Sequence, residues 1–215
     1  MKPVRIVIMA KAPLPGLAKT RLIPALGEDG AALLAQRMLD HTIATALAAA
    51  IGPVECCVTP DHLHPVWSAR QYDAALHWSS QSDGDLGARM EDVSRRVITD
   101  GEFLLLIGTD CPGLEAQHLQ LAARWLEHGV VSMIPVLDGG YCLLGLSQFD
   151  ATLFSNIFWG SAVVAQQTRQ RVSQLGWNMI ELATLQDIDE PGDLAALPAG
   201  FMDPVQFSLS NGGML

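Results

Sequence analysis

Hydrophobic runs alternate with amphipathic segments along most of the chain. Short apolar runs, several of them rich in β-branched residues, predict strands over 4–9, 54–59, 75–80, 103–108, 130–136, 141–146 and 178–182. Segments with apolar residues at helical spacing predict helices over 29–51, 86–99, 115–128 and 161–175, with a short final helix after Pro191. This alternation is typical of a doubly wound, mostly parallel sheet covered by helices.

Two of these runs refine the expected sheet. The run "FLLLIG" (103–108) is apolar throughout, as is usual for a strand buried on both faces of a parallel sheet. The segment "LDGG" separates the runs 130–136 and 141–146, and an Asp-Gly break between two strand-like runs is a hairpin signal. We therefore expect an α/β fold with a mixed, mostly parallel sheet that contains one antiparallel excursion.

The length of 215 residues suits one α/β domain, which we expect over 1–203, followed by a weakly structured tail over 204–215. Apolar residues make up 49% of the chain and charged residues 17%, as in ordinary globular proteins. The four cysteines have no CxxC spacing, which favours reduced thiols. No signal peptide is recognisable, and the apolar stretch "TIATALAAAI" is too short to cross a bilayer, so we expect a cytoplasmic protein.

The charge is unevenly distributed. The net charge of −10 argues against a nucleic-acid or anionic-membrane partner, because a broad basic surface is missing. The segment "MAKAPLPGLAKTRL" (9–22) nevertheless holds Lys11, Lys19 and Arg21, and no acidic residue precedes Glu28. Lysine and arginine bind phosphates through charge-assisted hydrogen bonds, so this loop is a candidate anion site.

The basic loop is not a P-loop. Lys19 and Thr20 fit the end of the pattern G-x-x-x-x-G-K-[ST], but Pro13 and Ala18 occupy its glycine positions. Gly16 would still let a ligand approach the backbone closely. We predict a phosphate-binding loop, and the alternative is a solvated loop whose basic residues pair with surface acids.

Two carboxylates follow predicted strands. Asp110 comes directly after the apolar run 103–108, and Asp138 lies in the break before 141–146. Because ligands of open α/β sheets bind at the carboxyl ends of the strands, we expect both near the basic loop. Mg²⁺ is typically held by one or two carboxylates together with substrate phosphates. The alternatives are that Asp110 caps the following turn or helix and that Asp138 only shapes a hairpin.

Other polar and glycine positions complete the candidate site. Gly139 and Gly140 would allow a ligand to lie against the backbone. In "SSQSDGDLGARM" (79–90), Gln81 and the backbone near Gly87 could read the edge of a nucleobase, because an amide both donates and accepts hydrogen bonds. The alternative is a plain loop in which Asp85 caps the next helix.

Six segments in order resemble a known family over about residues 4–197: "MAKAPLPGLAKTRL", "QSDGDLGARM", "LIGTDCPGL", "DGGYCLLGL", "FWGSAVVAQQT" and "LQDIDEPGDL". The family consists of bacterial proteins with the glycosyltransferase-A fold, provisionally described as nucleotide-diphospho-sugar transferases; some are assigned to arsenosugar biosynthesis. The superfamily includes nucleotidyltransferases that make molybdenum guanine dinucleotide, phospholactyl-guanosine and sugar nucleotides. The resemblance implies a three-layer, Rossmann-like fold.

The resemblance also implies roles for single residues. Lys19 and Arg21 match the family's "KTRL", in a loop that wraps the nucleotide phosphates. Asp110 matches the metal-bearing carboxylate of the superfamily, and Gln81 and Gly87 resemble the segment that contacts the base. In "DIDEPGDL", Glu190 takes the place of the family's capping threonine, which predicts a weaker start for the last helix.

Together these observations predict a Mg²⁺- or Mn²⁺-dependent transferase that passes a glycosyl group from a nucleotide sugar to a small-molecule acceptor. The expected catalytic residues are Lys19, Asp110 and Asp138, and the last two are the expected metal ligands. The residues expected to bind the nucleotide are Lys11, Gly16, Lys19, Arg21, Gln81, Gly87, Gly139 and Gly140. Two alternatives remain: nucleotidyl transfer with release of pyrophosphate, and a non-catalytic nucleotide-binding protein.

Overall fold

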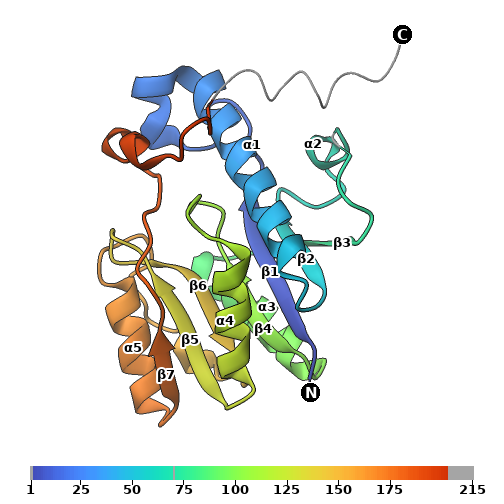
Figure 1. Cartoon of the computed structure of the whole chain (residues 1–215), viewed down its shortest axis with the longest axis vertical. Helices are drawn as coiled ribbons and strands as arrows, with labels where there is room; N and C mark the ends of the chain where they lie inside the picture. The colour runs from blue at the N-terminus through green and yellow to red at the C-terminus, as the bar shows by residue number, and fades with distance from the viewer. Residues whose placement is uncertain (1, 70, 203–215) are drawn as a thin grey trace.

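A single mixed sheet forms the middle layer of the computed structural model, which describes residues 2–69 and 71–202 (Figure 1). Its seven strands are β1 Val4–Lys11, β2 Val54–Thr59, β3 Leu76–Ser80, β4 Phe103–Ile107, β5 Val130–Pro135, β6 Tyr141–Leu146 and β7 Asn178–Glu181. They lie in the order β3-β2-β1-β4-β6-β5-β7. The order reverses beside β1 and β4, where open α/β sheets place their ligands.

Strand β6 is the antiparallel excursion that the "LDGG" break predicts. It pairs antiparallel with β4 and β5, whereas the other neighbouring strands pair in parallel. Leu144 lies opposite both Leu106 and Met133. Only a short turn joins β5 to β6, and a parallel connection would need a crossover of a dozen or more residues. The predicted mixed sheet is therefore confirmed.

Helices cover both faces of the sheet, as alternating strand and helix patterns predict. The helices α1 Ile23–Ala49 and α4 Ala116–Leu126 pack on one face, and α3 Leu86–Thr99 and α5 Val164–Gln174 on the other (Figure 1). A short helix, α2 Pro65–Ser68, precedes β3. In α4, for example, Leu119, Ala122 and Leu126 are all fully buried, which matches helical spacing along one face. Within the described residues, no helix combines the length and the apolar character needed to cross a membrane.

Several boundaries differ from the predicted ones. Strand β1 continues to Lys11, so this lysine belongs to the strand rather than to the loop. Helix α1 begins at Ile23 rather than near residue 29 and is interrupted at Gly27, whose φ of 71° is outside the helical region. The predicted tail over 204–215 lies outside the described residues.

The last helix is a 3-10 helix, Pro191–Ala196, and its start is better capped than predicted. The backbone N–H of Glu190 donates to Asp193 Oδ2 at 2.7 Å, and the Glu190 side chain accepts from the backbone N–H of Asp193. This reciprocal capping satisfies two backbone donors. The expectation of a weak start was wrong because the Glu190 carboxylate accepts the hydrogen bond that a threonine hydroxyl would have accepted, and Asp193 binds the N–H of Glu190 in return.

A buried carboxylate joins β2 to its neighbours. Glu55 is 3% exposed and accepts from Ser79 Oγ and Arg96 Nη2, both at 2.5 Å, with Arg5 Nη1 at 3.4 Å. Burial alone would raise the pKa of Glu55, but the hydrogen bonds from Arg96 and Ser79 outweigh burial and hold the pKa below its usual value. The ionised form is therefore the one that stabilises the fold.

Replacing Glu55 with Gln should lower the free energy of unfolding at pH 7 by about 1–3 kcal/mol, the range for a hydrogen bond to a charged group. A carboxyl whose pKa is lowered by folding stabilises the protein above its unfolded value, and this contribution disappears as the pH falls through the folded value. The difference between the two proteins in urea unfolding should thus shrink as the pH falls below 4.5, the ordinary pKa of a glutamate side chain. The exposed Glu127→Gln is the control, and a difference independent of pH would contradict the assignment.

Candidate active site

Two adjacent cavities open at the carboxyl ends of the central strands. We call them cavity 1, of about 320 Å³, and cavity 2, of about 280 Å³. The residues that line both form a shared rim: Met9, Thr109, Asp110 and Asp189. The loops after β1, β4 and β5 all contribute, so the structure brings together the three loops that the strand ends predict. The segment that follows β7 joins them.

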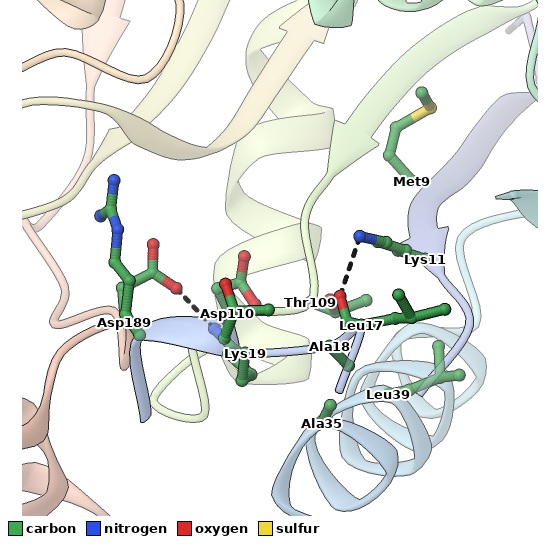
Figure 2. Close-up of a pocket in the computed structure, with 12 residues that line it drawn as sticks. Met9, Lys11, Leu17, Ala18, Lys19, Ala35, Leu39, Thr109, Asp110 and Asp189 are labelled. Atoms are coloured by element: carbon green, nitrogen blue, oxygen red, sulfur yellow. Dashed lines mark hydrogen bonds and ion pairs between the residues drawn. The ribbon is translucent and has the colours of Figure 1, made fainter. Parts of the chain in front are cut away.

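Cavity 1 is lined by the three cations of the basic loop, Lys11, Lys19 and Arg21. Lys19 is the most constrained: its φ of 47° and ψ of 45° are left-handed values that few residues other than glycine adopt. Its side chain is 8% exposed, and Nζ lies 2.5 Å from Asp110 Oδ1 and 2.7 Å from Asp189 Oδ1 (Figure 2). The same Nζ donates to the carbonyl of Ile188 at 2.6 Å.

These contacts determine the charge of Lys19. Burial alone would lower the pKa of its ammonium group, but Asp110 and Asp189 outweigh burial and raise the pKa. Lys19 is therefore a permanent positive charge that links two segments far apart in the sequence. Lys19 thus pairs with acids as the alternative of a solvated loop has it, but its side chain is buried rather than solvated.

Lys11 and Arg21 are less engaged. Lys11 Nζ donates to the carbonyl of Leu17 at 2.9 Å and makes no ion pair within the described part of the chain (Figure 2). Arg21 is 63% exposed, and its Nη1 is 3.9 Å from Glu190 Oε1. An exposed pair at this distance contributes little stability. Both side chains thus keep hydrogen-bonding capacity for an anion in cavity 1.

Three carboxylates gather beside the shared rim. Asp138, Asp187 and Asp189 each offer an oxygen, and these oxygens all lie within 4.8 Å of one another. Asp187 is 7% exposed. Burial, and then repulsion by Asp138, raises its pKa to about 6, with further contributions from Asp189 and Asp193. Hard oxygen donors so close together suit Mg²⁺ or Mn²⁺.

Sequence reasoning missed Asp187 and Asp189. They flank Ile188, which is fully buried against a small cluster between α1 and the C-terminal segment. In extended chain, side chains alternate, so burial of Ile188 turns both neighbours to the opposite side. The pattern Asp-Ile-Asp after the last strand could have indicated two carboxylates on one side of the chain. From the sequence it was interpreted only as part of the motif that begins the last helix.

The two predicted metal ligands have different surroundings. Asp110 is half-exposed, its carboxylate pairs with Lys19, and it does not belong to the group of three carboxylates. Helix α4 has Glu115 as its N-cap, so the alternative that Asp110 caps this helix was wrong. Asp138 does shape a turn, because the N–H of Gly140 donates to its Oδ1 at 2.7 Å, and it also faces Asp187.

The predicted glycines serve different purposes. Gly16 has a φ of +75°, and an added Cβ would meet only ordinary contacts, so the turn rather than space requires glycine. A Cβ on Gly87 would lie 2.3 Å from Trp159 Nε1, and one on Gly139 would lie 2.1 Å from the carbonyl oxygen of Ala162. At these two positions neighbouring atoms of the protein, not a ligand, occupy the space that a side chain would need. Of the four predicted glycines, all within the described residues, Gly140 alone lines a cavity, cavity 2.

Gln81 is held by the strand ends. Its Nε2 donates to the carbonyls of Ala10 at 3.1 Å and Cys57 at 2.9 Å, and its Oε1 accepts from Arg89 at 3.1 Å. The amide predicted to read a base is thus engaged within the protein. The alternative for this loop is confirmed in one respect, since Asp85 caps α3 by accepting from the N–H of Ala88 at 2.9 Å.

Comparison with known proteins gives the chain a family and a fold. Residues 42–161 match the model of a family described as uncharacterised proteins conserved in bacteria, DUF2064. No curated protein matches the chain. Among solved structures, a protein of Desulfovibrio desulfuricans G20, provisionally described as a nucleotide-diphospho-sugar transferase, is 28% identical, with a TM-score of 0.84 over 98% of this chain and 92% of that chain.

More distant structures share the fold. A nucleotidyl transferase of Methanothermobacter thermautotrophicus is 16% identical, with a TM-score of 0.60 over 93% of this chain and 97% of that one. Rv0371C of Mycobacterium tuberculosis, solved in complex with manganese, is 14% identical, with a TM-score of 0.53 over 92% of this chain and 98% of that one. The predicted three-layer fold of nucleotide-diphospho-sugar transferases is confirmed.

Proposed function

The chain belongs to the DUF2064 family of proteins conserved in bacteria, and we propose that it is a metal-dependent transferase that binds a nucleotide sugar and passes its glycosyl group to a small molecule. One observation carries this proposal. The ammonium group of Lys19 is bound to Asp110 and Asp189 at the rim that cavities 1 and 2 share. Cavity 1, which is lined by cations, thus borders the cluster of aspartate carboxylates along the shared rim.

Cavity 1 suits the phosphates of the donor. Lys11 and Arg21 have hydrogen-bonding capacity to spare, and Lys19 supplies a charge at the boundary with the carboxylates. Charge-assisted hydrogen bonds to phosphate are about twice as strong as neutral ones. Lys11 and Arg21 would hold the diphosphate. Lys19, whose three ammonium donors are already engaged by two carboxylates and a backbone carbonyl, would contribute its charge to stabilising the negative charge that develops as the diphosphate leaves.

A divalent ion suits the carboxylate group. Asp138, Asp187 and Asp189 would hold Mg²⁺ or Mn²⁺, because their charges are crowded and no ion pair neutralises Asp187 among the residues that the structure describes. Such an ion would supply Lewis-acid stabilisation of the phosphate charge. The manganese complex of Rv0371C, which shares the fold, is in keeping with this choice. Asp110 would then position Lys19, and its role as a metal ligand stays a prediction.

The reaction class follows from the donor. Glycosyl transfer releases a nucleoside diphosphate, and the similarity at 28% identity to a provisional nucleotide-diphospho-sugar transferase favours it. Nucleotidyl transfer, the second candidate, releases pyrophosphate, and the nucleotidyl transferase of Methanothermobacter has the same fold.

A thermal-shift panel tests both candidates. Nucleotide sugars and nucleoside triphosphates are compared with Mn²⁺ present, since a ligand at a hundredfold excess over its Kd adds about 2.7 kcal/mol of stability. The largest shift with a nucleotide sugar supports the proposal, and the largest with a triphosphate, together with pyrophosphate release, overturns it in favour of nucleotidyl transfer. If no nucleotide sugar or triphosphate shifts the protein, both candidates fail, and so does nucleotide binding without catalysis.

Arg21→Ala should weaken nucleotide binding without changing stability. A charge-assisted hydrogen bond is worth about 1.5–3 kcal/mol, so we expect a loss of roughly tenfold or more in affinity. Because Arg21 is 63% exposed, the urea midpoint should not move. Titration calorimetry with the best ligand of the panel measures the affinity. Arg124→Ala, an exposed change of the same charge on α4, is the control, and equal affinities in the two variants would rule out the assignment of cavity 1.

A further inference from the structure

Cavity 2 differs in chemistry from cavity 1. Its walls are mainly apolar, with contributions from Met9, Leu86, Met90, Leu106, Trp159 and Val164. These side chains come from four elements and from the segment before α5. A surface of this kind binds the apolar body of a ligand by removing it from water.

One end of cavity 2 is strongly acidic. Asp110, Asp138, Asp187 and Asp189 line it, and no lysine or arginine does so in the described ranges 2–69 and 71–202. Lys19 reaches Asp110 and Asp189 from the side of cavity 1 and neutralises one charge. Even with a divalent ion added, the four carboxylates keep one net negative charge. The diphosphate of a bound donor adds further negative charge.

The shared rim gives cavity 2 a place in the reaction. Cavities 1 and 2 meet at Asp110 and Asp189, so a molecule bound in cavity 2 lies next to phosphates bound in cavity 1. We propose that cavity 2 receives the acceptor, and that this acceptor is an uncharged or cationic molecule with an apolar body and a hydroxyl or amino group at one end. This inference rests on the proposed function.

The acceptor's oxygen or nitrogen bonds to the anomeric carbon of the sugar, and the bond from that carbon to the diphosphate oxygen breaks. The electron pair leaves with the nucleoside diphosphate, whose charge the cations of cavity 1 stabilise. The proton of the acceptor passes to water. A phosphorylated or carboxylated acceptor is disfavoured, because its negative charge would be repelled by the carboxylates at close range.

Three probes of nearly equal shape test this inference: 2-phenylethanol, 2-phenylethylamine and 3-phenylpropanoate. Binding is measured by saturation-transfer NMR with Mg²⁺ present and no nucleotide. We expect the alcohol and the amine to bind and the carboxylate to bind at least about tenfold more weakly. Leu86→Trp, which fills the cavity from a side chain that is 46% exposed, should abolish binding. Leu121→Trp, at 42% exposure outside both cavities, should not.

The outcomes separate this inference from the proposed function. Equal or tighter binding of 3-phenylpropanoate overturns the inference, as does binding that Leu86→Trp leaves unchanged. Displacement of 2-phenylethanol by uridine, cytidine, adenosine or guanosine also overturns it, because cavity 2 would then take the base of the donor. None of these results alters the nucleotide affinity that Arg21 controls. Conversely, selective probe binding in a protein that binds no nucleotide would reject the proposed function, and with it the acceptor role, while the ligand preference of cavity 2 would stand.

Discussion

Asp187→Asn is expected to abolish the effect of Mn²⁺ on nucleotide affinity and, at the same time, to stabilise the metal-free protein. The carboxylate of Asp187 is 7% exposed, and its burial together with Asp138 and Asp189 raises its pKa to about 6. At pH 7 the folded protein therefore holds a charge that its surroundings oppose. Asparagine keeps the shape and removes this charge, which should add about 1–3 kcal/mol to the free energy of unfolding.

The loss of metal dependence follows from the same charge. Mg²⁺ and Mn²⁺ depend on charged oxygen donors, and an amide oxygen is a much weaker ligand. Removing even a residue that only supports a metal ligand costs about 10–100-fold in metal affinity, so a direct ligand should cost at least as much. The opposed changes in stability and binding would mark a site in which charge is kept for function at the expense of stability.

Titration calorimetry with and without Mn²⁺, together with urea unfolding, measures both effects. Asp92→Asn, an exposed change on α3, is the control for charge. Asp110→Asn tests the other predicted ligand: if it loses metal dependence as fully as Asp187→Asn, Asp110 also binds the ion. Full metal dependence in Asp187→Asn would mean that the three neighbouring carboxylates do not form the metal site.

Lys19→Ala is expected to weaken both nucleotide binding and the fold. Its Nζ contacts two carboxylates and the carbonyl of Ile188, and the side chain is 8% exposed. Breaking a buried ion pair costs about 3–5 kcal/mol, but Asp110 and Asp189 are 51% and 37% exposed, so we expect roughly 1–3 kcal/mol. Nucleotide affinity should fall about tenfold or more with the loss of the cation.

The matched comparison is Lys11→Ala in the same basic loop. Lys11 is exposed and makes no ion pair in the described part of the chain, so its removal should lower affinity and leave the urea midpoint unchanged. A double-mutant cycle of Lys19→Ala with Asp189→Asn should show a coupling free energy above about 0.5 kcal/mol. Additive effects, or an unchanged midpoint in Lys19→Ala, would contradict the structural role of Lys19. Either result would mean that Lys19 contributes no more to stability than an exposed loop residue does.

The difference between Lys11 and Lys19 was not accessible from sequence. Both lie in one acid-free segment, and their local sequence does not show which of them is buried. The structure buries Lys19, whose carboxylate partners lie about 90 and 170 residues further along the chain. Local patterns carry no information on such partners. The same holds for Gly87, whose missing side chain is explained by Trp159.

The elements and their order are what the sequence by itself determined. Apolar periodicity depends on near neighbours, so it predicted α3 over Leu86–Thr99 and β6 over Tyr141–Leu146 at their observed bounds. Because strand ends share one edge of a parallel sheet, it also predicted that the loops after β1, β4 and β5 would meet. The tertiary structure alone decided which charged and polar side chains lie next to one another. It brought Asp187 and Asp189 to Asp138, engaged Gln81 between strands, and separated an acidic, apolar cavity from a cationic one, because these contacts depend on packing between distant segments.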